Sequence, residues 1–168
     1  MSIKTLDDIT GKIVDAAYKL HTHLGPGLLE SVYEIVLARD LERRGLRIAR
    51  QQQISFDYEG LHFKDVLRID LMVESRVVVE IKSVEKLMPV HPKQLLTQLR
   101  LLNFPVGLLI NFGAFRLKEG LQRIVNSLSP DASPYLRINQ ALKNEVTHYS
   151  ASSAPPREPS SFFPETRR

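Results

Sequence analysis

Residues 69–82 read IDLMVESRVVVEIK, and this stretch decides the fold. In both halves of it, residues alternate between an apolar face and a more polar one, the period of two that is typical of β-strands. A three-residue turn at 74–76 would join the halves into an antiparallel hairpin. The register that this turn predicts pairs Val73 with Val77, Leu71 with Val79 and Ile69 with Ile81.

The same register brings charged residues together on the other face of the hairpin. Asp70 lies opposite Glu80, and Lys82 follows two residues further along. Cross-strand Cβ atoms are roughly 4.5–5.5 Å apart, so the two carboxylates repel each other unless a cation lies between them. Mg²⁺ prefers oxygen ligands in octahedral geometry and is the natural candidate. Lys82 would then steady an attacking water or a developing negative charge.

A salt-bridged network on a solvated sheet face is the alternative explanation for these charges, since charged residues are common on edge strands. The run Val77-Val78-Val79 argues against an edge, because consecutive β-branched apolar residues indicate a strand that is buried on both faces. Charge in such a strand favours a functional explanation.

The spacing Asp-x9-Glu-x-Lys resembles the catalytic core of the PD-(D/E)XK nuclease superfamily. An upstream segment, LGPGLLESVYE at 24–34, is similar to the signature of the GxxExxY family, a bacterial branch of that superfamily, with Gly27, Glu30 and Tyr33 at the named positions. Two downstream segments, VHPKQLL at 90–96 and VGLLINFG at 106–113, continue the resemblance in the same order. It covers roughly residues 8–127.

The resemblance implies a metal site and a set of catalytic residues. Asp70 and Glu80 would hold Mg²⁺ or Mn²⁺ together with the backbone carbonyl of Ile81, and Lys82 would position the attacking water. Glu30 would complete the metal shell directly or through a water. The alternative for Glu30 is that it only favours the start of its helix, an effect worth about 0.3–1 kcal/mol.

Further residues are expected around this core. Related nucleases with a Q-x3-Y motif orient the metal site from a helix, and Gln94 matches the glutamine while Gln98 stands at the tyrosine position. Gln94 is therefore assigned to the catalytic set and Gln98 to substrate binding. Arg68 is expected to contact a phosphate, and Tyr33 either packs or donates to one.

Composition fits one compact domain with a tail. The chain has 168 residues, 43% hydrophobic content and no cysteine, which excludes disulfides and thiolate ligands. We predict a nuclease-like domain at 1–127 and a largely disordered Ser/Pro-rich tail at 128–168. There is no signal peptide and no apolar run of about 18 residues, so a cytoplasmic protein without a membrane partner is expected. The net charge of +4 alone decides little.

The hydrophobic pattern predicts helices at about 5–20, 28–44, 91–102 and 117–125. Strands are expected at about 48–58, 61–73, around Glu80 and at 106–112. This αα-βββ-α-β-α order predicts an α/β fold, a restriction-endonuclease-like mixed β-sheet flanked by helices.

The expected function is metal-dependent hydrolysis of phosphodiester bonds in DNA. The alternative is a non-catalytic nucleic-acid- or protein-binding module that has kept the fold. A homodimer is left open.

Overall fold

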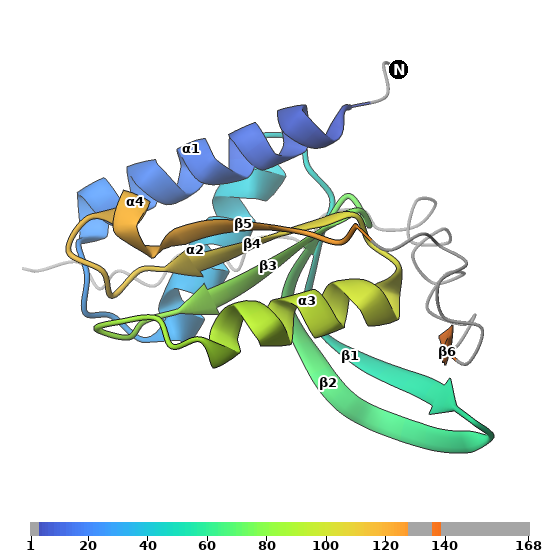
Figure 1. Cartoon of the computed structure of the whole chain (residues 1–168). Coiled ribbons are helices and arrows are strands. Elements are labelled where there is room, and N and C mark those ends of the chain that lie inside the picture. The colour runs from blue at the N-terminus through green and yellow to red at the C-terminus, as the bar shows by residue number, and fades with distance from the viewer. Residues whose placement is uncertain (1–3, 128–135, 139–168) are drawn as a thin grey trace, which may run out of the picture.

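The structure, a computed structural model, describes residues 4–127 and 136–138 and contains a mixed sheet with helices on both sides (Figure 1). In chain order the elements are α1 (Leu6–Leu24), α2 (Glu30–Arg43), β1 (Ile48–Tyr58), β2 (Leu61–Val73), β3 (Val77–Lys82), α3 (Val90–Leu102), β4 (Val106–Asn111), α4 (Leu117–Gly120), β5 (Leu121–Val125) and β6 (Leu136–Ile138). The strand order is β5-β4-β3-β2-β1-β6. The expected restriction-endonuclease-like α/β class is confirmed.

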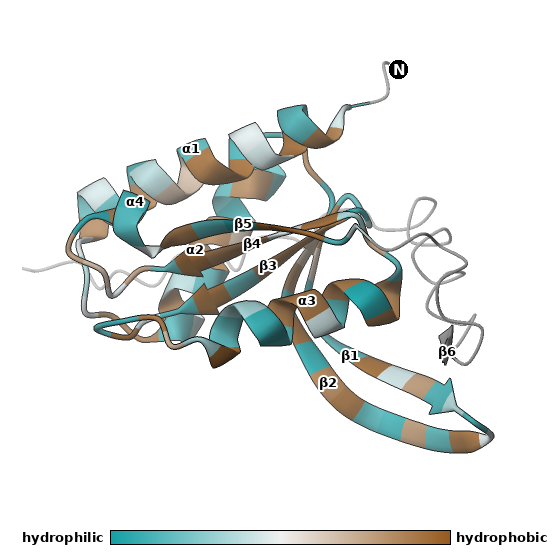
Figure 2. Ribbon diagram, viewed as in Figure 1, coloured by the Kyte–Doolittle hydropathy of each residue, from teal (hydrophilic) through white to brown (hydrophobic). Residues whose placement is uncertain are grey.

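The sheet separates two hydrophobic cores. In Figure 2 the central strands β3 and β4 are largely brown, because most of their residues are hydrophobic. Helices α1 and α2 cover one face, and α3 covers the other. Each fully buried aliphatic side chain contributes about 1.5–3 kcal/mol to stability. Ile9, Ile13, Leu37, Leu41, Val79 and Ile110 belong to the first core, and Ile54, Val78, Leu95, Leu99 and Leu109 to the second.

The central hairpin forms in the predicted register over its closed end. Leu71 pairs with Val79 and Val73 with Val77 across a turn in which Glu74 and Ser75 have φ angles of 51° and 53°. The predicted pair of Ile69 with Ile81 is not formed, because the ladder between β2 and β3 ends at Leu71. Beyond that point β2 continues with β1 as an arm that curves away from the sheet (Figure 1).

Strand β3 lies in the middle of the sheet and is buried on both faces, as the valine run predicts. It pairs antiparallel with β2 and parallel with β4. The side chain of Asn111, which is 1% exposed, extends the parallel pairing: its Oδ1 accepts from the N–H of Val84 at 3.0 Å, and its Nδ2 donates to the carbonyl of Val84 at 2.8 Å. The chain that leaves β3 is thereby held beside β4.

The predicted helix at 117–125 is wrong in its second half. Helix α4 ends at Gly120, and residues 121–125 form β5, which pairs antiparallel with β4. A Cβ on Gly120 would lie 2.5 Å from the carbonyl oxygen of Asn111, so the chain approaches β4 closely here and continues as its neighbouring strand.

The predicted disorder of the tail concerns residues outside the described part of the chain, with the exception of 136–138. These three residues form β6 and pair with Phe56–Tyr58 of β1. Within the described residues, no helix combines the length and the hydropathy needed to cross a membrane.

Candidate active site

Asp70 lies where β2 and β3 separate, and its carboxylate reaches across the gap. Asp70 Oδ2 accepts a hydrogen bond of 2.8 Å from the backbone N–H of Ile81. Burial and the nearby charge of Glu80 raise the pKa of Asp70 to about 6, although the Ile81 hydrogen bond and the charge of Lys82 act in the opposite direction. The predicted cross-strand pair of Asp70 with Glu80 is not part of the ladder, which ends at Leu71 and Val79, but the two carboxylates are close enough for the charge of Glu80 to act on Asp70.

Glu80 is 6% exposed and is held at both carboxylate oxygens. Its Oε1 is 2.7 Å from Nζ of Lys82, which is two residues further along β3. Its Oε2 accepts a 3.0 Å hydrogen bond from Nε2 of Gln98 on α3. A buried carboxylate needs such partners, because an unpaired charge away from water is costly.

Lys82 is the cation of the site in the described structure. Burial acts to lower its pKa, but the hydrogen bond to Glu80 and the charges of Glu80, Glu30 and Asp70 outweigh burial, so the pKa of Lys82 is raised. Lys82 therefore stays protonated at neutral pH and can donate to an oxygen.

Glu30 is the first residue of α2 and lies at the exposed rim of the site. Its Oε1 accepts a 3.0 Å hydrogen bond from the N–H of Ser83, the residue that follows Lys82. The hydroxyl of Ser83 in turn donates to the carbonyl of Leu28 at 2.6 Å. These two bonds join the start of α2 to the end of β3, and they bring Glu30 near Lys82.

Tyr33 has the packing role and not the phosphate-donor role in this structure. It is fully buried and its ring stacks on Phe112, with centroids 4.4 Å apart. Its hydroxyl donates to the carbonyl of Gly25 at 2.6 Å and accepts from the N–H of Leu28 at 3.2 Å. Tyr33 therefore fixes the loop that leads into α2, and the assignment of Tyr33 to substrate binding is corrected.

Glu34 is a buried carboxylate near the site that the sequence motifs do not single out. It is 5% exposed, and its carboxylate accepts from Nε of Arg50 at 2.8 Å and from Nε2 of Gln51. Its charge is one of the influences that raise the pKa of Asp70. The sequence feature that could have identified Glu34 is its position on α2, four residues after Glu30 and three before the core residue Leu37.

The two glutamines of α3 have different surroundings. Gln98 is buried and bonded to Glu80, whereas Gln94 is exposed and its side chain has no hydrogen bond within the described part of the chain. Arg68 is exposed on β2 opposite Gln53, two residues before Asp70. The structure thus gathers Asp70, Glu80, Lys82, Gln98 and, at the rim, Glu30, while Gln94 and Arg68 stay at the surface.

The donor set fits a divalent cation in its chemistry. Two carboxylates close enough to raise the pKa of one of them are an arrangement that a hard cation relieves. In addition, Gln98 Oε1 is buried without a partner among the described residues, so an acceptor is available for a donor such as a bound water. In the described conformation, no three acidic or histidine side chains are grouped as ion ligands.

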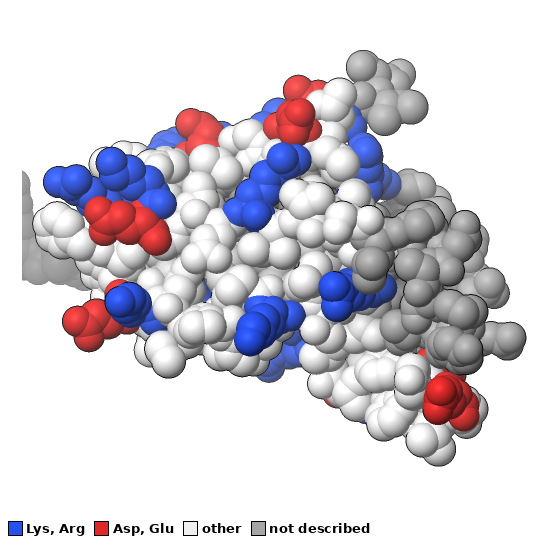
Figure 3. All heavy atoms as spheres, in the orientation of Figure 1, with Lys and Arg blue, Asp and Glu red and all other residues white. Residues whose placement is uncertain are grey.

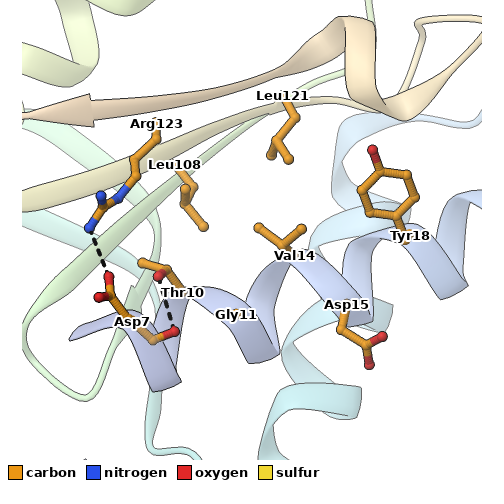
Figure 4. A pocket seen from close by; sticks show the side chains of 9 residues that line it. All are labelled: Asp7, Thr10, Gly11, Val14, Asp15, Tyr18, Leu108, Leu121 and Arg123. Atoms are coloured by element: carbon orange, nitrogen blue, oxygen red, sulfur yellow. Dashed lines mark hydrogen bonds and ion pairs between the residues drawn. The ribbon is translucent and has the colours of Figure 1, made fainter. Parts of the chain in front are cut away.

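A groove with a volume of about 610 Å³ lies elsewhere, between α1 and the β4–β5 edge of the sheet (Figure 4). Val14, Leu108 and Leu121 form its apolar lining, and Asp7 is bonded to Arg123 at one end. Its lining shares no residue with the acidic cluster.

On the face of the molecule drawn in Figure 3, charge does not by itself mark a nucleic-acid-binding surface. On the face drawn in Figure 3, basic side chains form separate groups, with acidic side chains beside some of them. The case for a function therefore rests on the cluster around Asp70.

A family model supplies independent support. The model described as the PD-(D/E)XK nuclease superfamily matches residues 7–124, well over half of the chain. The chain belongs to the PD-(D/E)XK nuclease superfamily. The match covers α1 through β5 almost to its end, including the whole acidic cluster. No curated protein and no solved structure matches the chain significantly.

Superfamily membership supports a nuclease-like function in general and points to a nucleic-acid substrate. Nucleases of the PD-(D/E)XK superfamily generally use divalent metal ions. The placement in the GxxExxY branch stays a prediction.

Proposed function

We propose that the protein is a Mg²⁺- or Mn²⁺-dependent nuclease of the GxxExxY branch that hydrolyses phosphodiester bonds in DNA. The observation that carries the proposal is the intact set of Asp70, Glu80 and Lys82, grouped where β2 and β3 separate. A site that had lost its activity would be expected to lose at least one of the three.

Asp70 and Glu80 would hold the metal, with the backbone carbonyl of Ile81 as a further ligand and Glu30 binding directly or through a water. The raised pKa of Asp70 supports this role, since a cation beside the two carboxylates would favour their ionised forms. When bound, such an ion lowers the pKa of a coordinated water and stabilises the charge on the phosphoryl group in the transition state.

Lys82 would orient the nucleophilic water and stabilise negative charge on the phosphate. Its Nζ holds its proton because the surrounding carboxylates raise its pKa. Lys82 therefore acts as a hydrogen-bond donor and not as a base. Arg68 and Gln94, which are exposed, would contact the DNA backbone.

The test is cleavage of single-stranded, double-stranded and branched DNA, and of RNA, with Mg²⁺ or Mn²⁺. Native protein is compared with Asp70→Asn and Lys82→Met, and Lys19→Met, which changes an exposed lysine of α1, is the matched control. We expect cleavage of DNA by the native and control proteins and its loss in both site variants. Absence of cleavage, or cleavage that survives in both site variants, would overturn the proposed site.

The alternative is a non-catalytic module that binds nucleic acid or protein through the same fold. The hydrogen bonds of Glu80 favour it, because Lys82 neutralises the charge of Glu80 and Gln98 holds its second oxygen without a metal. DNA binding that is retained in EDTA, without cleavage in any metal, would identify this function.

For a homodimer, α2 offers the surface. Val32, Ile35 and Val36 are exposed on α2, and Leu29, which directly precedes the helix, has 73% of its surface accessible. A group of exposed apolar side chains commonly marks an interaction site. Light scattering coupled to size-exclusion chromatography tests this point: a dimer that becomes a monomer in Ile35→Glu supports it, and a native monomer at high concentration contradicts it.

A further inference from the structure

We infer that Gln98 is a positioning residue that fixes the orientation of the Glu80 carboxylate for metal binding. This inference rests on the proposed metal-dependent function. The resemblance to the Q-x3-Y motif favours Gln94 for the metal-orienting role on α3. The inference assigns this role to Gln98 instead.

The burial of Gln98 follows from its place on α3. It comes three residues after Leu95 and four before Leu102, both of which pack in the core between α3 and the sheet. Gln98 is consequently 5% exposed, and its amide faces β3. A side chain with so little exposed surface suits support of another side chain better than contact with a substrate.

The hydrogen bond to Glu80 constrains that side chain. Gln98 Nε2 donates to Oε2, while Lys82 donates to Oε1, so that each carboxylate oxygen has a different partner. The terminal torsion of a glutamate is otherwise broad. With Oε2 bonded to the helix, Oε1 is the oxygen that stays directed at Lys82 and the site.

The second polar atom of Gln98 points to the same role. Gln98 Oε1 is buried and, within the described residues, lacks a hydrogen-bond partner. Buried acceptors in native proteins nearly always have a donor, and the neighbouring group Glu80 offers only acceptors when ionised. A water bound to a cation held by Glu80 has the donors that this atom requires.

Gln94 lacks these features. It is one helical turn away and exposed, and its side chain has no hydrogen bond in the described part of the chain. The role therefore moves by four residues along the same helix.

The experiment is calorimetric titration of Mn²⁺ into metal-free protein, with thermal unfolding of each variant recorded in EDTA. Gln98→Met keeps the length and burial of the side chain but removes the donor, and Gln98→Asn keeps the amide but is too short to reach Glu80. Thr97→Met, at an exposed position of the same helix, is the control. We expect both Gln98 variants to bind Mn²⁺ about 10- to 100-fold more weakly, and the control to bind as the native protein does.

The outcomes separate this inference from the proposed function. Native-like affinity in folded Gln98→Met and Gln98→Asn, with or without a lowered melting temperature, would show a merely structural role and overturn the inference while leaving the metal site in place. Absence of Mn²⁺ binding by the native protein would overturn the proposed metal site, and the role of Gln98 with it.

Discussion

The carboxylate of Asp70 accepts a 2.8 Å hydrogen bond from the backbone N–H of Ile81, two residues beyond Val79, the last residue of β3 that pairs with β2. A side chain thus satisfies a backbone donor that the neighbouring strand no longer reaches. The same residue carries one of the two charges of the proposed metal site. Asp70 consequently links the opening of the sheet to the chemistry of the site.

Replacement of Asp70 by asparagine tests the electrostatics without a metal. Burial and Glu80 raise the pKa of Asp70 from 3.8 to about 6, so the folded state favours the protonated form. The stability that results is present at low pH and is lost as the pH rises through about 6. Native protein in EDTA should therefore lose stability between pH 5 and pH 8, whereas Asp70→Asn should not. The free energy of unfolding of Asp70→Asn, relative to that of native protein, should rise by about 1 kcal/mol over this range. Urea unfolding at both pH values measures the free energy of unfolding of the two proteins. If the difference between them is the same at pH 5 and pH 8, the raised pKa of Asp70 is contradicted.

Lys82→Met should separate metal binding from catalysis. The substitution removes the cation that occupies Glu80 Oε1, so affinity for Mn²⁺ should be kept or increased. Cleavage should fall about 10²- to 10⁴-fold, because the donor to the water or phosphate is lost. Calorimetry and a cleavage assay on the same preparation measure the two effects. A parallel loss of both would mean that Lys82 organises the metal site itself.

Glu74→Gln should lower stability through contacts far from the site. Glu74 accepts from Lys4 Nζ and Arg47 Nε, each at 2.8 Å, and from the N–H of Arg47 at 3.1 Å. Burial opposes ionisation, but these partners outweigh it and lower the pKa of Glu74. Stability from such a group is present above its unfolded pKa and is lost as the pH falls through the folded one.

The expected cost of Glu74→Gln at pH 7 is about 1–2 kcal/mol. The difference from native protein should shrink as the pH is lowered from 6 to 3, whereas DNA cleavage at pH 7 should be unaffected. Denaturant unfolding across this range is the measurement. If the stability difference between native protein and Glu74→Gln grows as the pH is lowered, the ion pairs of Glu74 are excluded as its cause.

Tyr33→Phe tests the corrected role of Tyr33. The variant leaves the carbonyl of Gly25 and the N–H of Leu28 without the hydroxyl, which should cost about 1–2 kcal/mol. The ring can still stack on Phe112, so the fold and the cleavage rate should be kept. A large loss of cleavage at unchanged melting temperature would return Tyr33 to the substrate-binding set.

The hairpin was predictable because its two alternating runs and a short turn allow one register that buries the apolar face. Leu71 with Val79 and Val73 with Val77 pair accordingly. The separation of β2 from β3 beyond Leu71 could not be predicted from the sequence, because apolar and polar residues continue to alternate through Ile69. It accompanies irregular backbone in β1, where Gln51 has a φ angle of 51° and the register with β2 shifts between Ile54 and Phe56.

The second half of the predicted last helix fails for a physical reason. Leu117, Leu121 and Ile124 have helical spacing, but the open edge of β4 favours a strand at 121–125. Likewise, the choice between Gln94 and Gln98 depends on the rotation of α3 about its axis. Spacing places both residues on one stripe, and only the packing of Leu95 and Leu99 against the sheet decides which of the two faces Glu80.

The side chain of Asn111 acts as a short extension of β4, because one amide supplies both the acceptor and the donor that pair with the backbone of Val84. Aspartate lacks the donor, leucine lacks both groups, and glutamine is one methylene too long. Among relatives of this protein that keep the same turn after the Glu-x-Lys strand, asparagine should therefore be the residue that natural variation changes least at this position, although it has no part in the chemistry.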